Sequence, residues 1–100
     1  MREGDGSATS GAAWVSRRVI DGERPGYVEL TVDRINEFDS GWRFYAGDES
    51  QAYLDDVENC VMEHLAHTVE RWSELAELVA SAPAAGHWLW DTRERRYREI

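Results

Sequence analysis

The sequence predicts an α+β fold, in which a small and mostly antiparallel sheet carries one helical segment, or two short helices, packed on one face. Three segments rich in β-forming residues come first, a stretch with apolar residues at helical spacing follows, and two further β-rich segments end the chain. Strands grouped before and after a helical stretch are typical of the α+β class. A length of 100 residues corresponds to one domain with a single modest core.

Each predicted strand is bounded by turn residues. Residues 14–20 are rich in β-formers and stop at the Asp21–Gly22 turn signal, and residues 27–32 alternate between apolar and polar as a half-buried strand does. The full set of predicted strands is 14–20, 27–32, 42–45, 87–90 and 97–100. Residues 1–12, made mainly of Gly, Ser, Ala and charged residues, are expected to form a flexible tail ahead of a single domain over residues 13–100.

Residues 57–80 predict helix because apolar side chains recur at one-turn spacing. The recurring residues are Val61, Leu65, Val69 and Trp72. Spacings of four, four and three place them on one helical face. Ser73 is a candidate N-cap, so we expect two short helices that meet near residues 71–72. Either Asp55 or Asp56 is expected to cap the start of this helical part.

The charge balance narrows the classes of partner. Twenty acidic residues oppose eleven basic ones, which gives a formal net charge of -9. This charge argues against nucleic-acid binding and against docking on anionic membranes, since both need clustered positive charge, and it favours a basic protein partner. One cysteine excludes an intrachain disulfide, and the sequence shows neither a signal peptide nor a membrane-spanning apolar run, so we expect a cytoplasmic protein.

The segment between Asp39 and Asn59 combines aromatic residues, glycines and carboxylates, a mixture that belongs at a boundary between core and surface. The block Asp39–Glu49, which reads DSGWRFYAGDE, is followed by Tyr53-Leu54-Asp55-Asp56 and by Asn59. This pattern resembles the Imm33 immunity-protein family, earlier known as a domain of unknown function (DUF2185). The likeness covers about residues 13–98 and includes Trp14-Val15-Ser16 and the stretch from Gly86 to Trp88.

The resemblance implies a bacterial antitoxin-like role without catalytic activity. Immunity proteins of polymorphic toxin systems bind a cognate toxin and block it, and the mechanism expected here is occlusion with no cofactor. A regulatory or scaffold protein-interaction domain without a toxin partner is the alternative interpretation. A secreted-toxin gene next door would distinguish the two, and homodimerisation is left open.

Carboxylates are concentrated in the same part of the chain, because seven of them lie between residues 36 and 58 against a single basic residue, Arg43. One interpretation is a solvated loop whose acids make turns and caps. The other is an acidic patch that pairs with a basic toxin surface. Alternation along the strand predicts Trp42 and Phe44 in the core, with Arg43 on the opposite face. On the second interpretation the partner-binding residues are Asp39, Trp42, Arg43, Asp48, Glu49, Tyr53, Asp55, Asp56 and Glu58.

No catalytic or metal-binding motif accompanies this pattern. His64 and His67 stand three residues apart, whereas the zinc-protease motif needs two histidines four apart with a glutamate between them. The EF-hand spacing of calcium ligands is absent as well. Cys60 and His64 would meet on a helix, but no third group is placed to orient them as a nucleophile pair. We therefore expect no metal site, and a small hydrolase or metalloenzyme using the histidines is the remaining alternative.

Overall fold

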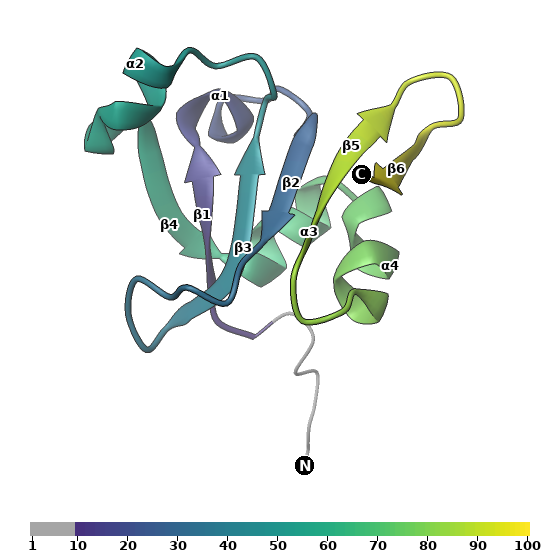
Figure 1. The fold of residues 1–100 in the computed structure, drawn as a ribbon, viewed down its shortest axis with the longest axis horizontal. Coiled ribbons are helices and arrows are strands. Elements are labelled where there is room, and N and C mark those ends of the chain that lie inside the picture. Colours follow the sequence, from purple (N-terminus) through teal and green to yellow (C-terminus); the bar gives the residue numbers. More distant parts are fainter. Residues whose placement is uncertain (1–9) are drawn as a thin grey trace.

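The computed structural model describes residues 10–100 and confirms the α+β class (Figure 1). Most of the predicted tail, residues 1–12, lies outside the described residues, and its last residue, Ala12, belongs to the first strand. The elements follow one another as β1 (Ala12–Ser16), α1 (Arg17–Ile20), β2 (Tyr27–Leu30), β3 (Asp39–Tyr45), α2 (Gln51–Asp55), the 3₁₀ helix η2 (Val57–Asn59), β4 (Cys60–His64), α3 (Leu65–Arg71), α4 (Glu74–Ser81), β5 (Gly86–Asp91) and β6 (Arg96–Glu99).

The strands form one six-stranded sheet in the order β4-β1-β3-β2-β5-β6. The β1–β3 pair is parallel and the other neighbouring pairs are antiparallel, which confirms the mostly antiparallel sheet. Strands β1 and β2 follow each other in the chain but are not neighbours, because β3 lies between them. The central position of β3 means that both of its edges are paired, with β1 on one side and β2 on the other.

One face of the sheet is covered by α3 and α4, which lie behind the strands in Figure 1. The register places Val28 opposite Phe44 and Leu30 opposite Trp42, so these side chains share this face. Trp42 and Phe44 are buried here with stacked rings, as the alternation predicts. The buried core cluster consists of Ala13, Val15, Val19, Val28, Leu30, Trp42, Phe44, Leu65, Val69, Leu75, Val79 and Trp88.

The helical prediction for residues 57–80 is correct from residue 65 onward and wrong over residues 60–64, while residues 57–59 form the 3₁₀ helix η2. Helices α3 and α4 meet at Trp72, as expected, although Ser73 makes no side-chain capping bond. Residues Cys60–His64 are instead the edge strand β4, which pairs with β1. A spacing of four residues leaves two side chains on the same face of a strand as well as of a helix, so Val61 and Leu65 fit both structures.

The first predicted strand, residues 14–20, is also too long. It ends at Ser16, whose hydroxyl oxygen accepts a hydrogen bond from the Arg18 amide and starts the short helix α1. Helix α1 then buries Val19 in the core. Across the described residues, helices are all too short or too polar to cross a membrane.

Candidate interaction surface

The face of the sheet opposite α3 and α4 carries a row of aromatic and charged side chains. The register places Tyr27 opposite Tyr45 and Glu29 opposite Arg43, all on this second face. The ring of Tyr27 stacks on Tyr45 at 6.0 Å and on His87 at 5.9 Å between centroids, and its hydroxyl lies 2.5 Å from His87 Nδ1. Burial, followed by the negative charge of Glu29, raises the pKa of Tyr45 to about 12, so its phenol is neutral at physiological pH.

Asp39 and Arg43 form a buried ion pair at one end of this second face. The Arg43 guanidinium donates two hydrogen bonds of 2.8 Å to the Asp39 carboxylate. That carboxylate also accepts the backbone amides of Ile35, at 2.7 Å, and Gly41, at 2.8 Å. Burial alone would raise the pKa of Asp39, but the bonds from Arg43, Ile35 and Gly41 outweigh it and lower the pKa to about 2.

The expectation that Asp39 presents its charge to solvent is therefore wrong. Its side chain is 0% exposed and that of Arg43 is 9% exposed, so the pair is neutralised inside the domain. The physical reason is that the loop between β2 and β3, residues 31–38, folds over this end of the second face. Arg43 donates to the Asp33 carbonyl oxygen at 3.1 Å, which ties the pair to the loop.

The opposite end of the second face is covered by residues 46–59. Glu49 turns inward there, and its carboxylate accepts the backbone amides of Ala46 at 2.7 Å and Gly47 at 2.8 Å. Burial would raise its pKa, but hydrogen bonds from Gly47, Ser16 and Ala46 lower it below the usual range. Gly47 has a φ of +114°, a conformation that suits glycine. Glu49 therefore holds the backbone of residues 46–49 in place, and its carboxylate is not presented fully to solvent.

Four other predicted acids remain exposed in this segment, and we call them the acidic rim: Asp48, Asp55, Asp56 and Glu58. Asp48 pairs with Arg18 at 2.7 Å. Asp56 accepts the Glu58 amide at 2.9 Å and caps η2, which confirms the capping role expected of Asp55 or Asp56. The rim also exposes Val57, so it combines charge with one apolar side chain.

Two of the predicted residues remain, Tyr53 and Trp42. Tyr53 is half-buried, and its backbone oxygen accepts a hydrogen bond from Asn59 Nδ2 at 2.9 Å, while its amide donates to the capping hydroxyl of Ser50. Trp42 lies on the helix-covered face, away from the second face. The predicted site is thus divided into the exposed acidic rim, the buried residues Asp39, Trp42 and Arg43, and the partly buried residues Glu49 and Tyr53.

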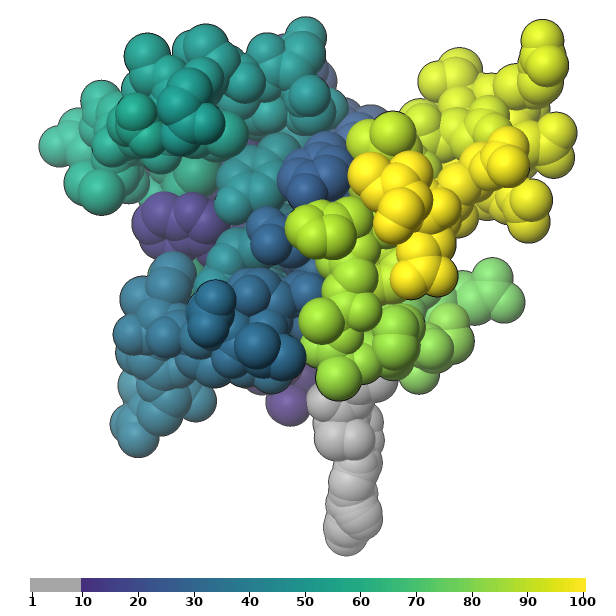
Figure 2. Space-filling view, in the orientation of Figure 1, coloured from purple at the N-terminus to yellow at the C-terminus, as the bar shows by residue number. Residues whose placement is uncertain are grey.

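The structure adds exposed residues that the sequence interpretation did not include. Three apolar side chains, Val32, Ile35 and Phe38, are exposed in the loop between β2 and β3. The sequence pattern that could have indicated them is the presence of three large apolar residues in a segment without strand or helix periodicity. Figure 2 shows this loop (blue, lower left) and residues 46–59 (teal, upper left) in one view, at opposite ends of β3.

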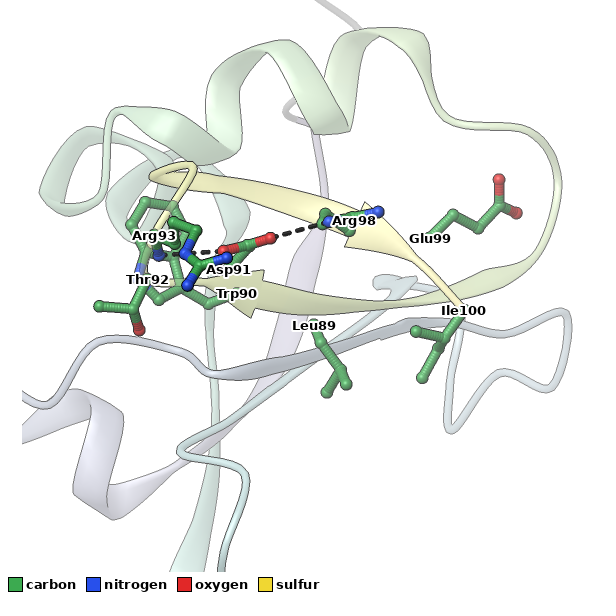
Figure 3. Close-up of a pocket in the computed structure, with 8 residues that line it drawn as sticks. All are labelled: Leu89, Trp90, Asp91, Thr92, Arg93, Arg98, Glu99 and Ile100. Atoms are coloured by element: carbon green, nitrogen blue, oxygen red, sulfur yellow. Dashed lines mark hydrogen bonds and ion pairs between the residues drawn. The ribbon is translucent and has the colours of Figure 1, made fainter.

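The β5–β6 hairpin carries an open hollow of about 570 Å³ (Figure 3). Leu89 and Ile100 point the same way from the hairpin, and Arg98 reaches Asp91 at 3.0 Å. The Asp91 carboxylate also accepts the backbone amides of Arg93 and Glu94, so it organises the turn. Asp91 and Arg98 thus bond each other and hold the turn of the hairpin.

Cys60 and His64 do not meet as they would on a helix. Both residues belong to β4, where four residues span about 13 Å. Cys60 is buried, and burial followed by the charge of Glu49 raises the pKa of its thiol. His64 and His67 contact edge to face at 5.3 Å. Within residues 10–100, no three His, Cys, Asp or Glu side chains gather as a metal centre would require.

Fold and surface together define a small α+β domain whose second face carries aromatic, charged and apolar side chains. The chain belongs to the Imm33 immunity protein family, because the family model for the Immunity protein Imm33 domain matches residues 13–100. This match confirms the resemblance drawn from the Asp39–Glu49 block. No curated protein and no solved structure matches the chain. Family membership suggests a toxin-neutralising immunity role, and immunity proteins are generally not catalysts.

Proposed function

We propose that this protein neutralises a cognate bacterial toxin by binding and covering it, without catalysis of its own. The observation that carries the proposal is membership of the immunity family over residues 13–100. The net charge of -9 supports it further, since an acidic protein attracts and orients a partner with a basic surface. The proposed setting is the bacterial cytoplasm.

The acidic rim supplies the electrostatic part of the proposed contact. Asp55, Asp56 and Glu58 are exposed, and the ion pairs formed within residues 10–100 do not include them. Asp48 is exposed too, although Arg18 engages it. Charges at the edge of an interface mainly change association rate and its salt dependence. We therefore assign the rim to steering and orientation, with Glu49 holding the backbone of residues 46 and 47 beside it.

The test is binding to the toxin encoded next to the gene. The wild-type chain and that toxin are co-expressed and purified, and affinity is measured with Glu58→Lys, Asp55→Lys and the double variant. Both positions tolerate the change, because their side chains are exposed and Asp55 ends a helix, where a cation is favourable. We expect each reversal to weaken binding about three- to tenfold, mostly through slower association.

Glu70→Lys is the matched control. Glu70 is an exposed glutamate on α3, which covers the other face of the sheet, and its reversal changes the net charge by the same amount as Glu58→Lys. We expect Glu70→Lys to leave affinity within about twofold of the wild type. If Glu70→Lys and Glu58→Lys weakened toxin binding equally, only net charge would matter, and the rim would have no special part in the mechanism. A wild-type chain that fails to bind the neighbouring toxin would overturn the proposed function itself.

A further inference from the structure

The loop between β2 and β3, residues 31–38, exposes more large apolar surface than a solvated loop needs. Val32 is 65% exposed, Ile35 is 55% exposed and Phe38 is 66% exposed. The loop projects as a lobe from one end of the sheet (Figures 1 and 2). Single exposed apolar residues are ordinary on proteins, but three within seven residues of one projecting loop indicate a contact site for another protein.

The backbone of this loop is held tightly although its apolar side chains point outward. The Phe38 amide donates to Asn36 Oδ1 at 2.9 Å, and the Asp33 amide donates to Thr31 Oγ1 at 3.1 Å. Arg34 donates to the backbone oxygen of Ser40. These bonds fix the loop locally, as Asx and Ser/Thr turns do.

The buried ion pair fixes the same loop from below. Asp39 accepts the Ile35 amide and Arg43 donates to the Asp33 oxygen, so the pair grips the loop at two points. Gly41 makes this closeness feasible: it has a φ of +94°, and a Cβ there would lie 2.5 Å from the Thr31 backbone oxygen. A buried ion pair is a weak source of stability compared with apolar packing. The main effect of the Asp39–Arg43 pair is therefore to fix the conformation of the loop.

A fixed loop is well suited to binding. A flexible loop loses conformational entropy when it docks, whereas a loop ordered during folding has already lost it. Exposed apolar side chains on a rigid support are the usual anchors of tight interfaces. The loop also carries the exposed acids Asp33 and Glu37, while its one base, Arg34, is engaged with Ser40.

We propose that the loop between β2 and β3 is a preformed docking element that seats Val32, Ile35 and Phe38 in an apolar depression, rimmed by basic residues, on the toxin. The buried Asp39–Arg43 pair is the positioning device that keeps the loop in its binding shape. This inference rests on the proposed function and adds a second contact to the acidic rim. Charge favours this partner over a second copy of the chain, because two copies with a net charge of -9 repel each other.

The first test replaces the apolar side chains. Ile35→Ser, Phe38→Ser and the double variant are titrated against the purified toxin encoded beside the gene, and their thermal unfolding is recorded. We expect the double variant to bind about 30-fold more weakly or worse, with an unchanged melting temperature, since the side chains are exposed. Ile100→Ser is the matched control because Ile100, like Phe38, is 66% exposed, and it should change affinity less than about twofold.

The outcomes separate this inference from the function on which it rests. Tight binding by the wild type and equally tight binding by the double variant would overturn the docking loop and leave the immunity role standing. Failure of the wild type to bind would overturn both. A wild-type homodimer that Phe38→Ser dissociates, measured by analytical ultracentrifugation, would assign the loop to self-association and contradict the proposed occupant.

The second test addresses the ion pair. Asp39→Asn is examined by hydrogen exchange and by toxin binding. We expect faster exchange at the Ile35 amide, which donates to Asp39, together with at least about fivefold weaker binding, while the amide of Phe44 in the core strand stays protected. Faster exchange at Ile35 with undiminished affinity would show that the loop shape is irrelevant to binding and would overturn the positioning role.

Discussion

At the scale of single residues, Asp39 carries the most consequential charge in the domain. Its carboxylate receives four hydrogen bonds, two from the Arg43 guanidinium and one each from the amides of Ile35 and Gly41. These bonds favour the ionised form and hold the pKa at about 2, below the ordinary value of 3.8. A carboxyl group whose pKa is lower in the folded chain stabilises the fold at pH values above the unfolded pKa.

The pH dependence of stability follows from this shift. The contribution of Asp39 is fully present above about pH 4 and is lost as the pH falls to about 2. A difference of nearly two pKa units corresponds to about 2 kcal/mol of unfolding free energy. We expect Asp39→Asn to cost about 2–4 kcal/mol at pH 7, because Arg43 keeps its charge in a buried position, and to cost clearly less at pH 2.5.

Urea unfolding at pH 7 and at pH 2.5 measures this difference. Glu37→Gln is the control, since Glu37 is an exposed carboxylate two residues away in the chain, and its removal should change stability by less than about 0.5 kcal/mol at either pH. If Asp39→Asn loses as much stability on acidification as the wild type, the ionised carboxylate is not what stabilises this end of the sheet.

The same residues mark where sequence reasoning stopped. Alternation correctly placed Trp42 and Phe44 in the core and Arg43 on the other face. It could not show that the second face is also covered at this point, because the covering loop contacts Arg43 through Asp33, which lies ten residues earlier in the chain. Charged residues on a strand that is covered on both faces are buried and support the fold. Whether a strand is covered in this way depends on the three-dimensional path of the chain.

At the scale of elements, pairing between distant segments accounts for what the sequence patterns missed in the sheet. The strand β4 was predicted as helix because its apolar spacing of four is compatible with both structures, and pairing with β1 decides between them. The late hairpin β5–β6 was predicted correctly, since its pairing is local and its turn at residues 92–95 is short. The parallel pairing of β1 with β3 joins segments far apart in sequence, and no local pattern encodes it.

Two serines at helix starts give a matched prediction at this scale. Ser50 Oγ accepts the Tyr53 amide at 3.1 Å and caps α2, whereas Ser73 precedes α4 without a side-chain capping bond. We expect Ser50→Ala to cost about 1 kcal/mol, seen as faster hydrogen exchange at the Tyr53 amide. Ser73→Ala should cost less than about 0.3 kcal/mol. Equal effects of the two substitutions would show that helix propensity, and not the cap bond, sets the stability of α2.

At the scale of the whole molecule, charge and apolar contact occupy opposite ends of the same strand. The acidic rim follows the carboxyl end of β3, and the apolar loop precedes its amino end. The seven residues of β3 span about 20 Å. A standard interface buries about 800 Å² on each partner, a patch roughly 30 Å across. On the proposed function, one toxin surface would therefore be large enough to meet both ends and the aromatic row of Tyr45, Tyr27 and His87 that lies on the same face.

The proposed division of roles between the acidic rim and the loop predicts how salt affects binding to the toxin. Charges at the rim act over distance and are screened by ions, whereas apolar contacts of the loop act only after docking and are not. We expect the association rate with the neighbouring toxin to fall about tenfold between 0.05 M and 0.5 M salt, while the dissociation rate changes less than about twofold. At high salt, the Phe38→Ser variant should still dissociate faster than the wild type. At high salt, the association rates of Glu58→Lys and the wild type should become nearly equal. Stopped-flow association and surface-based dissociation measurements separate the two rates. An association rate that does not respond to salt would show that the charge of -9 has no part in recognising the toxin.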